Sequence, residues 1–377
     1  MKKPFVKGGK ALTLTAALLC TAAFLGSLMA FGTTAQAETQ AEAQAFTPGV
    51  AGRITSCKIS GDKQNVEIGF SSTGDVTGTD GNIYIFEMQP YEEELGSRSN
   101  FIASSPALSA ASVSVPLNLG IPQDKLYSRF VLAVFDGTKF IKVSQPHYIT
   151  NPELIAKNQT SFNDPLTKKG LVIEIDMLND AFDLGVKHVT TNIAFSQIMG
   201  TGIDYQYDGK TYHFNKGVVD AYDKTISALS NKGMTVTVIL LNDWNPNTPD
   251  LVYPGTQKNS NAFYYMFNAE TEAGFDQTKA IASFLAQHYS GGNPNYGKVS
   301  NWIIGNEINN QQWNYMGAMD LTNYVKAYQK AFRVIYTAIK STNANDRVYF
   351  SLDYNWMNEI EASLSMEGGR LWTALTP

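Results

Sequence analysis

Short strand-like runs, several of which alternate apolar and polar residues, occupy the chain between residues 53 and 150. They are rich in β-branched and aromatic residues and read ITSCKIS, NVEIGF, NIYIFEM, SVSVPL, RFVLAVF and KFIKV. Turn signals such as Asp80-Gly81 and Asp136-Gly137 separate them. A period of two is typical of strands that bury one face. We therefore predict a small antiparallel β-sandwich over residues 53–150.

From residue 165 onward, strand-like runs alternate with helical periodicity. The apolar runs are GLVIEID, KHVTTNIAF, MTVTVILLNDW, VSNWIIGNEI and RVYFSLDYNW. Between them, a helical stripe from Val218 to Leu229 is followed by Gly233, which can end a helix, and Asp320 is placed to cap a longer helix. This alternation predicts a parallel sheet covered by helices.

Two arrangements of a parallel sheet fit the alternation, an open doubly wound sheet and a closed barrel. No G-x-G-x-x-G fingerprint follows the first strand, and polar or aromatic residues gather at the carboxyl ends of several strands, where a barrel carries its site. We therefore predict a (β/α)8 TIM-barrel-type domain over residues 165–377. Only about five strands can be assigned where a barrel needs eight, so we expect a barrel truncated after about five strands. A short, open five-stranded sheet is the alternative.

The amino terminus has the features of a secretory signal peptide. Lysines precede an uncharged apolar run from Ala11 to Phe31, and a small-residue cleavage site ends at Ala37. We expect a signal peptide over residues 1–37, a disordered spacer over 38–52, and a secreted, extracellular protein that keeps no membrane segment after cleavage. An uncleaved membrane anchor is the alternative.

The net charge of the chain limits the classes of partner that it can bind. Without the lysines of the signal peptide, the formal net charge of −5 becomes about −9, and no Lys and Arg patch argues for nucleic acid. Neutral polymers are therefore the expected substrate class.

Cleavage would leave Cys57 as the only cysteine, so we expect no internal disulfide. Because His147, His188, His213 and His288 show no metal-binding spacing, we expect neither a metal nor a cofactor.

Asn306 and Glu307 directly follow the apolar segment WIIG, which we count as the fourth strand. Cleavage of a glycosidic bond needs a carboxylic acid that protonates the leaving oxygen and usually a second carboxylate. The segment NWIIGNEINN resembles the acid/base strand of clan A retaining glycoside hydrolases, which are (β/α)8-barrel enzymes with an Asn-Glu pair at this place. The resemblance implies that Glu307 is the general acid and then base, and that Asn306 binds a sugar hydroxyl. The alternative is a strand end that caps a turn.

Polar and aromatic side chains at other strand ends are expected to contact the sugar. Hydrogen-bonding groups beside flat apolar faces suit a polyhydroxylated ring, although each residue alone also fits a capping or packing role. The predicted substrate-binding residues are Asn192, Asn242, Trp244, Trp313, Asp353 and Trp356. The resemblance implies a nucleophilic carboxylate on a seventh strand, and no such strand can be assigned before Pro377.

Residues from about Leu166 to Trp356 also resemble a group of secreted bacterial proteins known only as a domain of unknown function with a glycosidase-like barrel. We therefore expect a secreted glycoside-hydrolase-like protein that acts on or binds a poly- or oligosaccharide, and a retaining enzyme where the full barrel exists. Without the nucleophile, this chain alone is expected to be inactive. The alternatives are a non-catalytic carbohydrate-binding protein, an inactive fragment, or a structural role for the β-rich part.

Overall fold

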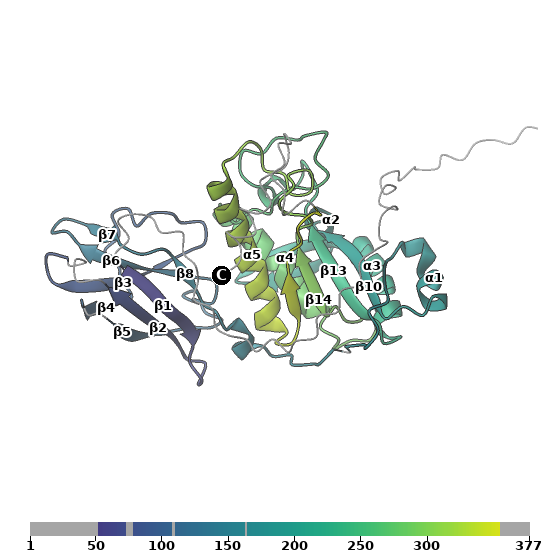
Figure 1. Cartoon of the computed structure of the whole chain (residues 1–377), viewed down its shortest axis with the longest axis horizontal. Coiled ribbons are helices and arrows are strands. Elements are labelled where there is room, and N and C mark those ends of the chain that lie inside the picture. The colour runs from purple at the N-terminus through teal and green to yellow at the C-terminus, as the bar shows by residue number, and fades with distance from the viewer. Residues whose placement is uncertain (1–51, 73–77, 108–109, 163, 355–377) are drawn as a thin grey trace, which may run out of the picture. The chain divides into compact units, whose positions relative to one another are not determined.

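The computed structural model describes residues 52–72, 78–107, 110–162 and 164–354 (Figure 1). All of them belong to one compact unit that begins at Ala43. The predicted signal peptide and nearly all of the spacer lie outside these ranges. Within them, no helix combines the length and the apolar character that a membrane crossing requires.

Two antiparallel sheets form the β-sandwich that the alternating runs predict. One sheet has the order β1-β2-β5, with β1 (Gly52–Ile59), β2 (Asn65–Ser72) and β5 (Ala111–Pro116). The other has the order β4-β3-β6-β7, and β8 also pairs with β6; its strands are β4 (Ala103–Pro106), β3 (Asn82–Met88), β6 (Arg129–Phe135), β7 (Phe140–Lys142) and β8 (His147–Tyr148).

Inward-facing side chains of both sheets share one core. Ile54 and Ile68 from the first sheet are buried together with Ile85 and Leu132 from the second. Cys57 lies in the same core, where burial raises the pKa of its thiol, so it remains a packed, uncharged side chain. Alternation of buried and exposed residues along β1 and β2 therefore sets the register of the sandwich.

The predicted parallel sheet is present. Its strands are β9 (Gly170–Val172), β10 (His188–Ala194), β13 (Thr235–Leu241), β14 (Asn301–Ile304) and β15 (Arg347–Tyr349), and every neighbouring pair is parallel. Each strand pairs with the next parallel strand along the chain, so the order never reverses as it does in a doubly wound sheet. Within the described ranges the sheet is open, with β9 and β15 at its edges, and no closed barrel forms.

The main helices are α3 (Lys216–Ser230), α4 (Glu272–His288) and α5 (Leu321–Thr342). Each is capped by a side chain that accepts a backbone hydrogen bond, as Asp320 does from the amide of Asn323 at 3.0 Å. Gly233 follows α3 with a φ of 75°, as predicted. The shorter helices are α1 (Leu178–Asp183), α2 (Phe195–Ile198) and three 3-10 turns, η1 (Pro152–Ile155), η2 (Ile175–Met177) and η3 (Pro249–Leu251).

An antiparallel hairpin of β11 (Gly202–Tyr207) and β12 (Lys210–Asn215) lies between β10 and α3 and was not predicted. The residues at its tip, Asp208 and Gly209, have φ values of 51° and 72°. An Asp-Gly pair with positive φ at both positions is a strong hairpin signal. The signal was present, and Ile203, Tyr205 and Tyr207 before it and Tyr212 and Phe214 after it alternate with polar residues, so the hairpin could have been predicted from the sequence.

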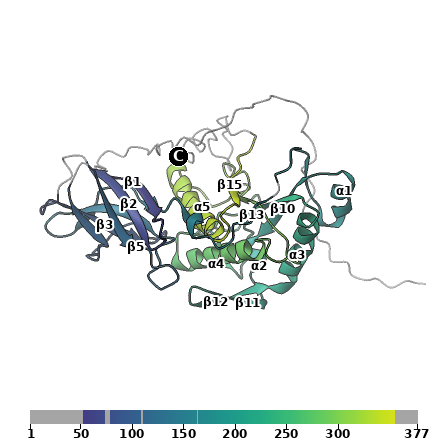
Figure 2. The ribbon, with the colours of Figure 1, turned by 90° about the horizontal axis from the view of Figure 1, so that it is seen from below.

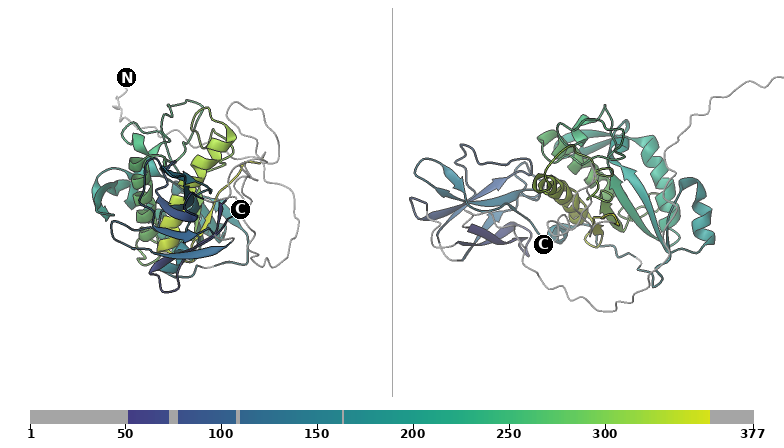
Figure 3. Two further views of the ribbon diagram at one scale, coloured as in Figure 1. Left: turned by 90° about the vertical axis from the view of Figure 1, so that its left-hand side faces the viewer. Right: turned by 45° about the horizontal axis from the view of Figure 1, so that its top comes forward.

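Helices cover one face of the parallel sheet. Val189 and Ile193 on β10 and Val238 on β13 are buried in one core with Ile226 of α3 and Leu285 of α4. Figure 2 shows α3 and α4 along one side of these strands, and Figure 3 gives two further views. On the other face, Asn192 is exposed, and Thr190, Thr237 and Ile303 are only partly buried. A consecutive strand order with helices on one side is the arrangement of a (β/α) barrel wall.

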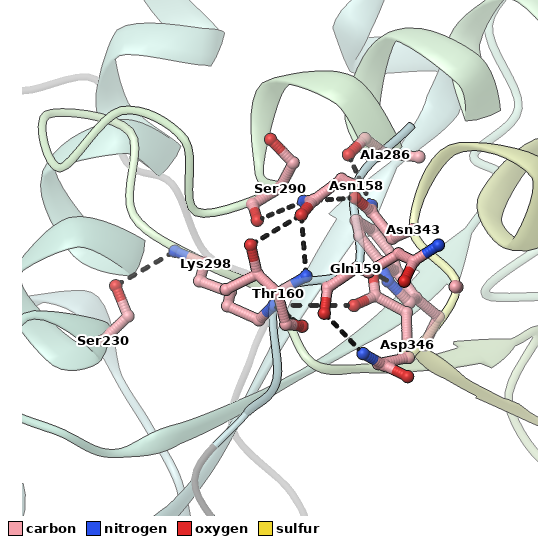
Figure 4. Close-up of polar contacts among 12 residues, drawn as sticks. Asn158, Gln159, Thr160, Ser230, Ala286, Ser290, Lys298, Asn343 and Asp346 are labelled. Atoms are coloured by element: carbon pink, nitrogen blue, oxygen red, sulfur yellow. Dashed lines mark hydrogen bonds and ion pairs between the residues drawn. The ribbon is translucent and has the colours of Figure 1, made fainter. Parts of the chain in front are cut away.

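A polar cluster at the amino-terminal ends of β14 and β15 holds the segment that enters the sheet (Figure 4). The Asn158 side-chain amide donates to the Ser290 carbonyl at 2.8 Å and to Asn343 Oδ1 at 2.8 Å. Lys298 Nζ donates to the Thr160 carbonyl at 3.0 Å. Asp346 is only 1% exposed beside these groups. The cluster therefore fixes residues 158–160 against the helical layer.

Candidate active site at the carboxyl edge of the parallel sheet

Glu307 lies in the turn that directly follows β14. Its φ is 44° and that of Gly305 is 73°, so two residues of this turn have left-handed backbone conformations. The Glu307 amide donates to Ser351 Oγ at 2.9 Å, and the Ile308 amide donates to the Ser351 carbonyl at 3.0 Å. A non-glycine residue with positive φ is strained and persists only where its surroundings hold it. Here the two hydrogen bonds to Ser351, in the segment after β15, hold Glu307 in this conformation.

Gly305 is required by this turn, which gives a first prediction. A Cβ at Gly305 would lie 2.8 Å from Ile308 Cγ2, whereas one at Gly255, with a φ of 79°, would meet nothing within 4 Å. We expect Gly305→Ala to lower the free energy of unfolding by more than the roughly 1–2 kcal/mol of the left-handed conformation alone. Denaturant unfolding measures the loss, and Gly255→Ala is the matched control. Equal losses in the two variants would contradict the close contact.

A reciprocal pair of hydrogen bonds ties the same turn to the segment after β15. Asn309 Nδ2 donates to Asp353 Oδ1 at 2.8 Å, and the Asp353 amide donates to Asn309 Oδ1 at 2.8 Å. Both side chains are buried, at 2% and 5% exposure. Asp353, which we predicted as a substrate contact, therefore supports the Glu307 turn through Asn309.

Two tyrosines of α5 hold the backbone on either side of Glu307. The Tyr328 hydroxyl donates to the Ile304 carbonyl at 2.6 Å, and the Tyr324 hydroxyl donates to the Ile308 carbonyl at 2.5 Å. Both side chains are fully buried. Because a buried carbonyl without a donor is costly, these bonds fix the path of the chain through the turn.

The Glu307 carboxyl group is half-buried, and its pKa is raised, first by burial and second by the negative charge of Asp353. A raised pKa keeps more of a carboxyl group protonated toward neutral pH. This is the protonation state that a general acid needs. Asn306 beside it is also half-buried and accepts a weak hydrogen bond from Ser351 Oγ at 3.5 Å.

The other polar residues predicted for the site are placed differently. Asn192 is exposed on the face of β10 that the helices leave open. Asn242 is 0% exposed and donates to the Leu251 carbonyl at 2.8 Å, so its side chain holds the loop after β13. Its neighbour Asp243 accepts from Gln197 Nε2 at 2.6 Å, and burial raises its pKa.

The aromatic residues predicted for the site are half-buried in loops at the carboxyl edge. The Trp244 ring packs on Tyr265 with 5.4 Å between ring centroids. Trp313 packs on Phe263 at 4.8 Å and is nearly parallel to Tyr264 at 6.1 Å. Trp356 lies outside the described residues.

Several residues that shape the site were not predicted from sequence. Ser351 and Asn309 act through hydrogen bonds between segments 44 residues apart, for which local sequence gives no signal. The run of three aromatic residues Phe263-Tyr264-Tyr265 is a signal in the sequence that could have indicated a binding loop. In the part of the chain that the structure describes, no three His, Cys, Asp or Glu residues are grouped so that they could hold a metal ion.

These features define a protein in which a β-sandwich precedes an α/β domain, and in which a half-buried carboxyl group follows the fourth strand of a consecutive parallel sheet. Residues 161–374 match the family described as "Family of unknown function (DUF5722)". The match covers more than half of the chain, and the chain therefore belongs to this family. No curated protein shows significant similarity to it.

Several solved structures of glycoside hydrolases are similar to parts of the chain. The β-glycosidase of Thermosphaera aggregans is 15% identical over 47% of this chain and 42% of its own, with a TM-score of 0.30. A family 39 glycoside hydrolase of Bacteroides cellulosilyticus WH2 is 14% identical over 80% of this chain and 48% of its own, also with a TM-score of 0.30. An endoglucanase of Pseudomonas stutzeri is 10% identical over 56% and 57%, with a TM-score of 0.32. The chain thus spans about half the length of these proteins.

Proposed function

We propose that this chain is a secreted glycoside-hydrolase-like protein in which Glu307 donates a proton to the oxygen of a glycosidic bond. The observation that carries the proposal is the position of Glu307, half-buried in a strained and firmly held turn at the carboxyl edge of the parallel sheet. In barrels of parallel strands, chemistry takes place at this edge. The raised pKa of Glu307 supports the same role.

The proposal includes a (β/α)8 barrel of which this sheet is one wall. The consecutive strand order and the single helical layer support it. Asn306 would bind the sugar hydroxyl beside the reacting carbon, and Asn192, Trp244, Trp313 and Trp356 would contact the sugar. The signal-peptide features before Ala37 support export.

Retaining hydrolysis needs a second carboxylate as nucleophile. The negative charge of Asp353 raises the pKa of Glu307. Asp353 is, however, buried and hydrogen-bonded to Asn309, so we do not assign it as the nucleophile. Among the residues described, the proposal therefore assigns the proton donor and no nucleophile. A second candidate function, which the aromatic side chains of Trp244 and Trp313 at the same edge support, is that the chain binds carbohydrate without cleaving it.

Incubation of the chain with soluble neutral polysaccharides separates the two functions. Release of reducing ends together with binding supports the hydrolase. Binding without release supports the binding protein. If neither binding nor release is observed with glucan, xylan and mannan, both candidate functions are contradicted.

The charge of Asp353 gives a second prediction. Asp353→Asn removes a negative charge near Glu307, while the new side-chain oxygen can still accept from Asn309. Because that charge raises the pKa of Glu307, we expect the pKa to fall in the variant. Protonated Glu307 is the active form, so the fall of kcat/KM with rising pH should begin at a lower pH. A pH profile measures it, with the exposed Asp183→Asn as control. An unchanged or upward-shifted limb would contradict the coupling.

A further inference from the structure

An aromatic surface lies beside the Glu307 turn and consists of Phe263, Tyr264 and Trp313. The Tyr264 and Trp313 rings are within 21° of parallel, and Phe263 is tilted by 43° to Trp313. Phe263 is 53% exposed, a large fraction for a phenylalanine that already contacts another ring. Because Phe263 continues into the partly exposed rings of Tyr264 and Trp313, the three form a contiguous apolar surface, the feature that marks a candidate binding site.

Backbone hydrogen bonds fix this aromatic surface to the carboxyl edge of the sheet. The Tyr265 amide donates to the Asn242 carbonyl at 2.8 Å, directly after β13. The Phe263 amide donates to the Gln312 carbonyl at 2.7 Å, and the Tyr315 amide donates to the Tyr264 carbonyl at 2.9 Å. The rings are therefore carried by two loops that pair with each other and hold a defined relative position.

The aromatic surface is close to Glu307 along the chain. The Asn310 amide donates to the Glu307 carbonyl at 2.8 Å, and the Trp313 amide donates to the Asn310 carbonyl at 3.0 Å. Two such turns in succession keep the Cα atoms of Glu307 and Trp313 within about 14 Å. A short oligosaccharide that reaches Glu307 can therefore extend over the rings.

The composition of the two loops indicates the class of ligand. Residues 259–269 and 308–319 contain no charged side chain and are rich in Asn, Gln and aromatic residues. Asp243, at the end of β13, is the nearby charge that acts on Tyr264. Such a surface offers neutral hydrogen-bonding groups around flat apolar rings, and these two segments carry none of the cations that a phosphate or nucleic acid requires. The C–H faces of a neutral sugar and its edge hydroxyls match it.

We propose that Phe263, Tyr264 and Trp313 form a binding subsite for one or more units of a neutral polysaccharide chain that extends from Glu307. The inference rests on the proposed function only in placing the sugar at the Glu307 edge. A second copy of the chain is the competing occupant, since exposed aromatic residues also support self-association.

Binding measurements with and without Phe263 test the subsite. In the Glu307→Gln background, we expect Phe263→Ala to weaken binding of soluble glucan, xylan or mannan, whichever the parent binds, by roughly tenfold. Phe101→Ala is the matched control, because Phe101 is a 42% exposed phenylalanine of the β-sandwich with similar ring contacts. Circular dichroism confirms that both variants are folded.

The outcomes separate the subsite from the proposed reaction. Weaker binding in Phe263→Ala but not in Phe101→Ala supports the subsite, even if Glu307→Gln retains sugar release and the proposed reaction fails. Unchanged affinity in Phe263→Ala overturns the subsite, as does a parent that binds none of the three polysaccharides. Self-association that Phe263→Ala abolishes and polysaccharide does not compete with also overturns it, in favour of the second copy.

Discussion

For the hydrolase function, Glu307→Gln is expected to reduce sugar release by at least about 100-fold while polysaccharide binding stays unchanged. Glutamine has nearly the shape of a protonated glutamic acid, but its amide cannot give a proton to the leaving oxygen. Proton transfer from a positioned acid contributes a factor of roughly 10²–10⁴, so its loss should fall in this range. The Glu307 turn should remain intact, because its hydrogen bonds come from the backbone amides of Glu307 and Ile308.

Kinetics with two leaving groups make this result specific for an acid. A substrate with an acidic leaving group needs little protonation, so Glu307→Gln should slow its cleavage much less than that of the polysaccharide. Glu67→Gln, an exposed carboxylate on β2, is the control for the same chemical change. Equal slowing of both substrates, or equal activity of Glu307→Gln and Glu67→Gln, would exclude Glu307 as the proton donor.

Periodicity in the sequence predicted the elements that bury a continuous face. β6 and β13 are long apolar runs, and α5 has a stripe that its buried residues follow, so local pattern and tertiary environment agree. β4 reads ASSP and β8 is only two residues long, so neither carries a pattern that distinguishes it from a loop. Their pairing partners in the sheet, rather than their own residues, make them strands.

The candidate site was predictable in place but not in geometry. An acidic residue that directly follows a strand of a parallel sheet lies at the edge where the strands end. This rule placed Glu307 at that edge. Its positive φ and its bond to Ser351 depend on β15 lying beside β14, and this contact is not local in sequence. Asn242 illustrates the converse, since a polar residue at a strand end can face a ligand or the protein interior, and here it is buried.

Asp346 shows how a buried polar group couples the stability of this domain to pH. Its carboxylate accepts from Trp302 Nε1 at 2.9 Å and lies 4.0 Å from Lys298 Nζ, and only 1% of the residue is exposed. Burial raises its pKa to about 6, against the lowering effects of Trp302 and Lys298. Desolvation of the charge therefore outweighs the favourable partners.

Asp346→Asn is expected to stabilise the domain above pH 6 by on the order of 3 kcal/mol, with the gain disappearing toward pH 4. The unfolded aspartate loses its proton near pH 4 and the folded one near pH 6. Between these values the folded state binds more protons, so the wild-type free energy of unfolding falls as pH rises. Asparagine carries no charge, and its oxygen can still accept from Trp302.

Denaturant unfolding of both proteins from pH 4 to pH 8 measures this difference directly. The curves should separate between pH 4 and 6 and run parallel above it, whereas Asp183→Asn, at the exposed end of α1, should follow the wild type throughout. Trp302→Phe provides an independent check, because it removes a hydrogen bond that lowers the pKa of Asp346 and should move the pH-dependent region upward. Curves of Asp346→Asn and wild type that stay parallel from pH 4 to 8 would show that Asp346 is ionised at no cost, and that Lys298 and Trp302 fully compensate its burial.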